Sequence, residues 1–227
     1  MGRTIAIGDV HGCLNELNEL LEKLELQPSD RLIFLGDLIN RGPNSHGVVK
    51  RVRGIPGAIT LLGNHELRLL RYARKEDPSI LRSTDEKTIA TLTKKDWRFL
   101  RHALLPYFYE PALNTIFVHG GFTPDKPWYK QSLKTITGIQ LIDNEGNPTN
   151  SKDCPQGIPW ADTWHGPPFV VYGHFPRSSA YERPHSIGID TGCVHGGALT
   201  AYILPDKHIV QVPARMCYSN GSRLFRS

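Results

Sequence analysis

Cysteine is scarce in this 227-residue chain, and long apolar runs are missing from it. The four cysteines form no C-x-x-C pair, so the sequence predicts neither a disulfide framework nor a zinc ribbon. No apolar run approaches the roughly 18 residues of a membrane-spanning helix, and the first residues lack the layout of a signal peptide. We therefore expect a protein of the reducing cytoplasm that has no membrane partner.

The chain also has only a small excess of positive charge. The 27 lysines and arginines outnumber the 22 aspartates and glutamates by only five. Nucleic-acid-binding proteins usually concentrate positive charge on one face, so the balance permits an anionic substrate without predicting stable nucleic-acid binding. One predicted helix carries four cations on one side, which is typical of a solvated face: Arg68, Arg71, Arg74 and Lys75.

Short apolar strands alternate with polar loops and amphipathic segments along the chain. Strands are predicted over residues 4–7, 31–35, 58–62, 115–118, 169–172, 187–190, 198–204 and 209–212. Helical spacing follows each of the first three, which is the rhythm of an α/β fold. No linker divides the chain, so we expect a single domain over residues 1–227. Residues 76–110 are predicted to form a mostly helical insertion.

Five of the loops that follow strands carry side chains able to bind a metal ion: Asp9, His11, Asp37, Asn64, His119 and His174. The carboxyl ends of strands that run the same way meet at one edge, so we expect these side chains to converge. If Asp37 bridges two ions, Asp9 and His11 complete one site and the other three residues complete the second. Two such ions activate a water for attack at phosphorus. The donor set, which has no thiolate, favours manganese, with iron, cobalt or zinc as alternatives.

The loop sequences resemble the ordered motifs of the PPP-type metallophosphatases, which are calcineurin-like phosphoesterases. The matching motifs are Gly8-Asp9-Val10-His11-Gly12, Gly36-Asp37-Leu38-Ile39-Asn40-Arg41-Gly42, Gly63-Asn64-His65-Glu66, His119-Gly120-Gly121 and Gly173-His174. This family includes serine/threonine protein phosphatases and symmetrical diadenosine tetraphosphatases, and residues 189–200 are similar to the end of the latter. The resemblance implies a central β-sandwich flanked by helices, two divalent ions bridged by Asp37, phosphate binding by Arg41 and leaving-group protonation by His65.

Position 40 departs from the family pattern, because protein phosphatases carry Asp where this chain has Asn40. An Asn carbonyl still accepts the imidazole N–H of His65, but it supplies no negative charge to keep the ring protonated. A weaker acid suits a nucleotide phosphate leaving group better than a serine alkoxide. We therefore predict a bis(5'-nucleosyl)-tetraphosphatase acting on dinucleoside polyphosphates, in which Asn40→Asp raises activity on phosphomonoesters.

Other functions remain open on the sequence alone. The alternatives are a protein serine/threonine phosphatase, a phosphatase of RNA ends or caps, and a lapsed nucleotide- or metal-binding scaffold. The intact set of ligands, together with Arg41 and His65, favours an enzyme over a scaffold. The second phosphate-binding arginine of protein phosphatases has no counterpart between His119 and His174, and Arg177 is the candidate to replace it.

Overall fold

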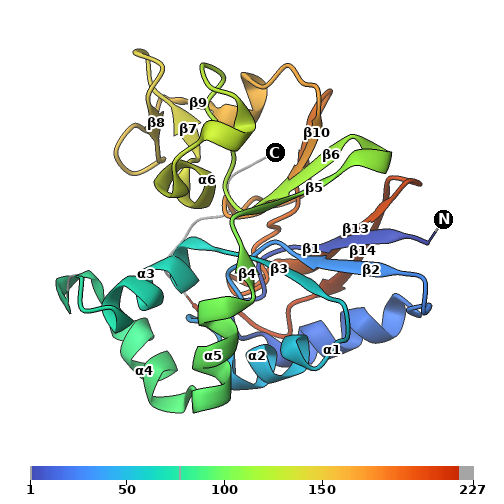
Figure 1. Ribbon diagram of the computed structural model, residues 1–227, viewed down its shortest axis with the longest axis vertical. Coiled ribbons are helices and arrows are strands. Elements are labelled where there is room, and N and C mark those ends of the chain that lie inside the picture. Colours follow the sequence, from blue (N-terminus) through green and yellow to red (C-terminus); the bar gives the residue numbers. More distant parts are fainter. Residues whose placement is uncertain (1, 77, 220–227) are drawn as a thin grey trace.

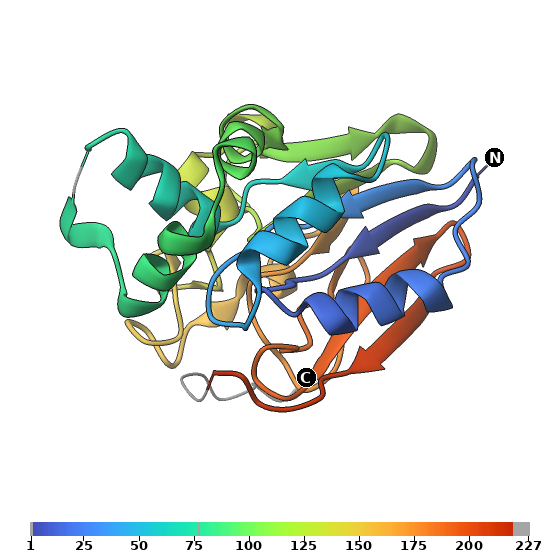
Figure 2. The ribbon, with the colours of Figure 1, turned by 90° about the horizontal axis from the view of Figure 1, so that it is seen from below.

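The computed structural model describes residues 2–76 and 78–219. Two sheets pack face to face, as predicted, and helices cover the outer face of the larger sheet (Figures 1 and 2). The six-stranded sheet has the order β14 (His208–Pro213), β13 (Ala198–Leu204), β1 (Thr4–Ile7), β2 (Arg31–Phe34), β3 (Ile59–Leu61) and β4 (Leu104–Leu105). The five-stranded sheet has the order β11 (Tyr181–Arg183), β12 (Ser186–Gly188), β10 (Phe169–Tyr172), β6 (Thr115–Val118) and β5 (Tyr107–Glu110).

The apolar strands are buried on both faces, which explains why they read as continuous hydrophobic runs. In β1, Ile5 and Ile7 pack toward the helices, whereas Ala6 lies in the core between the two sheets. Five helices lie on the side of the larger sheet: α1 (Leu14–Lys23), α2 (Ser45–Arg53), α3 (Asn64–Ala73), α4 (Ser83–Thr91) and α5 (Lys94–His102). Figure 2 shows α1 and α2 lying across the strands. The predicted alternation of strand and helix is thus confirmed for the first half of the chain.

A smaller unit sits at the free face of the five-stranded sheet (Figure 1). It contains α6 (Leu133–Gly138) and a three-stranded sheet of β7 (Leu141–Ile142), β8 (Pro148–Thr149) and β9 (Ile158–Pro159). Short 3-10 turns complete the described elements, at Pro78–Ile80, Pro111–Leu113, Trp128–Lys130 and Trp160–Asp162. No described helix is both long and apolar enough to cross a membrane.

The segment predicted as a mostly helical insertion is mostly helical, but it ends in two strands. Ser83–Thr91 and Lys94–His102 form α4 and α5, and Leu104–Leu105 and Tyr107–Glu110 form β4 and β5. Strand β4 extends the larger sheet beside β3, and β5 pairs with β6 of the smaller sheet. The insertion therefore returns the chain from one sheet to the other, and its two helices lie beside α2 and α3 (Figure 1).

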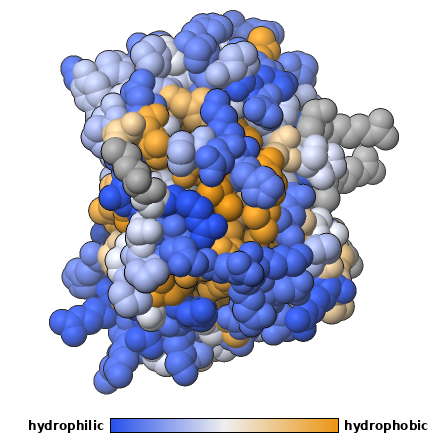
Figure 3. Space-filling view, turned by 90° about the vertical axis from the view of Figure 1, so that its right-hand side faces the viewer, coloured by the Kyte–Doolittle hydropathy of each residue, from blue (hydrophilic) through white to orange (hydrophobic). Residues whose placement is uncertain are grey.

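The parallel strands place their following loops at one end of the sandwich. Strand β1 pairs in parallel with β2, β2 with β3, and β6 with β10. The other end of the strands holds a cavity of about 550 Å³, whose lining includes Arg3, Arg31, Glu110, Leu113 and Pro205. On the face in Figure 3, apolar residues are visible in a hollow between hydrophilic rims. The polar loops that carry the predicted ligands lie away from this cavity.

Candidate functional site

The loops at the carboxyl ends of the strands hold five site residues in left-handed backbone conformations. The φ angles of His11, Asp37, Asn40, Arg41 and His174 are 45, 48, 70, 65 and 69°. Non-glycine residues rarely adopt positive φ, and such conformations cluster at functional sites because the surrounding structure has to enforce them. Gly173 allows the two sheets to meet here, since a Cβ on it would lie 2.2 Å from Asp9 Oδ1.

Within the described residues, Asp37, His119 and His174 form one of two groups that could hold a metal ion, and His174 is its half-buried member. The Nδ1 of His119 donates to the carbonyl of Leu35 at 2.9 Å, and the Nε2 of His174 donates to that of Gly138 at 3.1 Å. Each ring therefore presents a lone pair on its other nitrogen, and both lone pairs face Asn64 Oδ1, at 3.1 and 3.0 Å. Three acceptors facing one another beside a carboxylate fit a cation, so this donor set suits a divalent ion.

The second group consists of His11, Asp37 and His65. His11 donates from Nδ1 to the carbonyl of Ile39 at 2.9 Å, so its Nε2 lone pair points inward, 3.4 Å from Asp37 Oδ2. Arg41 Nη1 lies 3.0 Å from the same nitrogen. Asp37 belongs to both groups, which is the shared position expected of a bridging carboxylate.

Asp9 lies beside these groups but belongs to neither. Its Oδ1 accepts the backbone N–H of His174 at 3.0 Å, so it joins a loop of one sheet to a loop of the other. Its role as a metal ligand remains a prediction.

The rings of His11, His119 and His174 favour the neutral form at physiological pH. Burial lowers the pKa of His11, His119 and His174 to about 3, since it disfavours the charged ring. Arg41 contributes to the lowering at His11, and His119 contributes at His174. A neutral imidazole is the form that ligates metal ions.

Glu66 holds the Asp37 loop in place and was not assigned a role from the sequence. Its carboxylate is fully buried and accepts the backbone N–H groups of Asp37, Leu38 and Gly63, at 2.9, 2.9 and 3.2 Å. Burial and the neighbouring Asp37 raise the pKa of Glu66 to about 8. The bond from Gly63 also caps α3, which starts at Asn64, and this puts Asn64 and His65 at the edge of the site.

Asn40 contacts His65 through its amide nitrogen, and the expectation that its carbonyl accepts the imidazole N–H is wrong. Asn40 Nδ2 lies 2.9 Å from His65 Nδ1 and donates to Asp85 Oδ1 at 2.6 Å. The opposite amide orientation would bring two oxygens together at that distance, so Asp85 fixes the amide. Asn40 Oδ1 has no hydrogen-bond partner in the described part of the chain.

Arg68 is part of this network instead of a solvated helix face. Its guanidinium donates to both oxygens of Asp85, at 2.7 and 2.8 Å, and its side chain is only 11% exposed. Arg68 Nη2 also lies 3.0 Å from His65 Nδ1. Two donors therefore face Nδ1, so the neutral ring carries its proton on Nε2, which lies 3.9 Å from Asp37 Oδ2. Burial, followed by His11, Arg41 and Arg68, keeps the pKa of His65 well below its usual value.

Arg177 does not join the other predicted residues. It is 6% exposed, and its guanidinium stacks on the rings of Phe175 and Tyr181, at 4.6 and 3.5 Å from their centroids. The small cavity beside the candidate ligand groups is lined instead by Asp37, Arg41, Asn64, Gln140, Ser151, His174 and Pro176. The packing thus separates Arg177 from the described lining of the site.

Metal binding is expected to release protons. Burial, Asp190 and Asp37 raise the pKa of Asp9 well above its usual value, and burial raises that of Asp190 to about 7. A carboxyl with a raised pKa must lose its proton before it ligates, so affinity for manganese should fall as the pH falls. Calorimetric titration at pH 6.5 in two buffers with different ionisation heats measures the release. Equal heats in both buffers, or a release unchanged in Asp9→Asn, would contradict this expectation.

Comparison with known proteins identifies the family. A family profile described as calcineurin-like phosphoesterase matches residues 2–211. The asymmetrical bis(5'-nucleosyl)-tetraphosphatase PrpE of Oceanobacillus iheyensis is 33% identical over 92% of this chain and 91% of its own length. The symmetrical bis(5'-nucleosyl)-tetraphosphatase of Janthinobacterium sp. (strain Marseille) is 30% identical over 92% and 95%.

Solved structures agree with this assignment. A crystal structure of a protein provisionally named a diadenosine tetraphosphatase matches with a TM-score of 0.82 and 35% identity, covering 97% of this chain and 95% of that one. The metallophosphoesterase of Sphaerobacter thermophilus, at 18% identity and a TM-score of 0.58, shares the fold. The chain belongs to the calcineurin-like phosphoesterase family and is a metallophosphoesterase. The resemblance stated from the motifs is confirmed, with relatives of both the symmetrical and the asymmetrical type.

Proposed function

We propose that the protein hydrolyses the phosphoanhydride chain of bis(5'-nucleosyl) tetraphosphates. The observation that carries this proposal is the similarity, over more than nine-tenths of both chains, to tetraphosphatases of two types. Two ligand groups that share Asp37 supply a site suited to phosphoryl chemistry. The cell compartment in which we expect this activity remains the reducing cytoplasm.

The roles of the residues follow from their positions. Asp37 with Asn64, His119 and His174 would hold one divalent ion, and Asp37 with His11 and Asp9 the other; manganese is the ion we expect. When bound, two such ions polarise the phosphoryl oxygens and lower the pKa of a water. Arg41 is half-buried at this cavity, where its planar guanidinium can bind a phosphate group with two parallel hydrogen bonds.

His65 is proposed as the proton donor to the leaving group. Its Nε2 carries a proton, has no hydrogen-bond partner in the described chain, and lies at the Asp37 carboxylate. A ring that stays neutral is a weak acid. A weak acid is sufficient when the leaving group is a nucleotide phosphate, which departs readily. It is insufficient for a serine alkoxide, which is a poor leaving group. The environment of Asn40 therefore supports a polyphosphate substrate over a phosphoprotein.

Asn40→Asp alone is now expected to destabilise the protein. The new carboxylate would lie at the 2.6 Å contact with Asp85, and two carboxylates there must share a proton. We expect a loss of about 1–3 kcal/mol in the free energy of unfolding, the range for a broken buried contact. Denaturant unfolding measures it, and an unchanged stability would contradict the expected repulsion.

The double variant Asn40→Asp/Asp85→Asn restores one carboxylate and one amide with their places exchanged. A carboxylate beside His65 Nδ1 raises the pKa of the ring, so the acid stays protonated to higher pH than in the wild type. Activity on phosphomonoesters should therefore rise and persist to higher pH. A wild-type pH profile in the fully metallated double variant would show that position 40 does not select the leaving group.

A side-by-side assay tests the proposed substrate. Turnover is measured on diadenosine tetraphosphate, a phosphoserine peptide and an RNA 3'-phosphate, with and without a chelator. We expect the first substrate to be preferred and the chelator to abolish its turnover. Preference for the peptide or the RNA would favour the protein-phosphatase or RNA-end alternative, and turnover of none would favour a binding scaffold.

A further inference from the structure

A second cavity adjoins the metal ligands through Arg41. Its volume is about 340 Å³, within the usual range of small-molecule sites. It is lined by Arg41, Gly42, Pro43, Ser45, Thr84, Lys87, Thr88, Thr91 and Tyr218. Arg41 also lines the small cavity at Asp37, so the two spaces share one wall. We call the larger space the α4 cavity.

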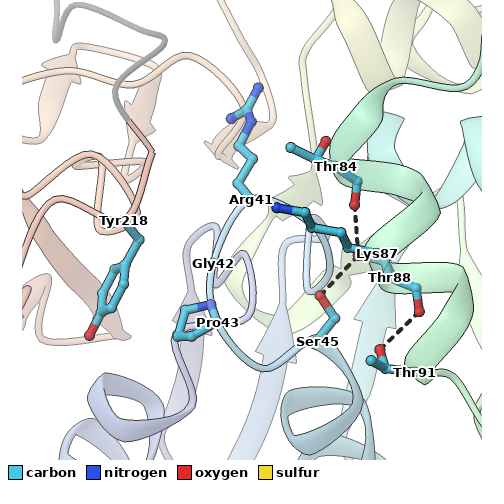
Figure 4. Close-up of a pocket in the computed structure, with 9 residues that line it drawn as sticks. All are labelled: Arg41, Gly42, Pro43, Ser45, Thr84, Lys87, Thr88, Thr91 and Tyr218. Carbon is cyan, nitrogen blue, oxygen red and sulfur yellow. Dashed lines mark hydrogen bonds between the residues drawn. The ribbon is translucent and has the colours of Figure 1, made fainter.

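The α4 cavity is built from three parts of the chain that the sequence does not connect. In Figure 4, Arg41 rises from its loop, Lys87 reaches across from α4, and the ring of Tyr218 lies on the far side. The Tyr218 hydroxyl donates to Glu16 Oε1 at 2.7 Å, which fixes this ring. Thr88 is held by Ser45 at 3.3 Å and by the carbonyl of Thr84 at 3.2 Å, so the wall beside Lys87 is ordered.

The lining of the α4 cavity contains two cations, Arg41 and Lys87, and no carboxylate. Several arginines of the described chain pair with an acid, as Arg68 does with Asp85. Neither Arg41 nor Lys87 forms an ion pair with a carboxylate anywhere in residues 2–76 or 78–219. The pKa of Arg82, at the start of α4, is lowered by burial and by Arg68 and Arg41, as expected where cations crowd together.

We propose that the α4 cavity binds the phosphate groups that lie on the leaving-group side of the bond being cleaved. This assignment rests on the proposed function. The same helix α4 supports His65 through Asp85, so the cavity and the proton donor share one side of the site. A chain of phosphates that leaves the metal ligands past Arg41 meets Lys87 next. A substrate with a single phosphate leaves this cation unused, so the cavity selects polyphosphates.

Lys87→Ala tests the assignment. The KM for diadenosine tetraphosphate should rise about tenfold with kcat changed far less, the effect of losing one charge-assisted contact. The KM for p-nitrophenyl phosphate should change much less, since that substrate has one phosphate. Lys87→Arg should restore most of the affinity. Lys95 is exposed on α5 and does not line the cavity, so Lys95→Ala is the matched control and should behave as the wild type.

Binding of inorganic tripolyphosphate gives a readout that does not depend on turnover. Calorimetry on chelator-treated protein should show weaker binding to Lys87→Ala than to Lys95→Ala, with equal unfolding temperatures. Equal binding, or equal KM values for diadenosine tetraphosphate, would overturn the assignment. A wild type that binds tripolyphosphate through Lys87 but does not hydrolyse diadenosine tetraphosphate would instead refute the proposed function and leave a polyphosphate site in place.

Discussion

Asp37→Asn is expected to remove both metal ions and to reduce turnover by more than about 10²-fold, the usual limit for losing a group that only supports a ligand. Asp37 Oδ2 lies 3.4 Å from His11 Nε2, and Oδ1 lies 3.5 Å from His119 Nε2. An amide replaces one of these oxygens with an N–H₂ group, which cannot ligate. One ion loses its bridge outright, and the other loses the partner ion and the negative charge.

The comparison that tests this shared role uses variants of unshared residues. His11→Ala and His174→Ala each remove a ligand of one group only, so each should retain more metal than Asp37→Asn. Metal content by elemental analysis is measured alongside kcat. Circular dichroism checks the fold, because Asp37 Oδ1 also accepts the backbone N–H of His65 at 3.0 Å. A folded Asp37→Asn protein that keeps both metals would contradict a bridging role.

The location of the site was predictable from the sequence because its residues follow parallel strands. Asp37 follows β2 and His119 follows β6, and the topology alone brings such loops together. Interactions between residues close together in the sequence are also readable from it. For example, Asn44 caps α2 by accepting the N–H of Gly47 at 2.8 Å. The spacing of residues within a loop and the order of the strands are both visible in the sequence.

The support of His65 was not predictable in this way. Asp85 lies 45 residues from Asn40 along the chain, in a segment without a motif, and its capping bond to Arg82 N–H is the only local signal it gives. Arg68 was placed on a solvated face because helical spacing shows which side a residue takes but not what later covers it. In the folded protein α4 covers this side of α3, where its Asp85 accepts from Arg68.

Residues 104–110 show the same limit for secondary structure. The prediction of a mostly helical insertion did not include the strand at its end, where Tyr107–Glu110 gains backbone hydrogen bonds by pairing with β6. Pairing between distant segments overrides local propensity. Sequence proximity to His174 likewise did not reveal the aromatic rings that enclose Arg177, and its role in phosphate binding stays a prediction.

His65→Ala is expected to reduce turnover of a phosphomonoester with a poor leaving group by on the order of 10²–10⁴-fold, the range for a positioned acid. The structure supplies the reason, since Nε2 carries the proton and Asn40 and Arg68 both donate to Nδ1. On p-nitrophenyl phosphate the loss should be much smaller, because that leaving group departs without a proton. Diadenosine tetraphosphate should fall between these two.

The dependence on the leaving group distinguishes an acid from a structural residue. His65 is buried next to Asn64, the proposed metal ligand, so its loss could also disturb the site and would then slow every substrate equally. Metal content is therefore measured for His65→Ala, and exposed His208→Ala serves as the control that should match the wild type. A steep dependence of rate on leaving-group pKa in His65→Ala, with a shallow one in wild type, is the expected signature of the missing proton. Parallel dependences in fully metallated proteins would remove His65 from the reaction and shift the role of the Asp85 network to holding Asn64 and Asp37 in place.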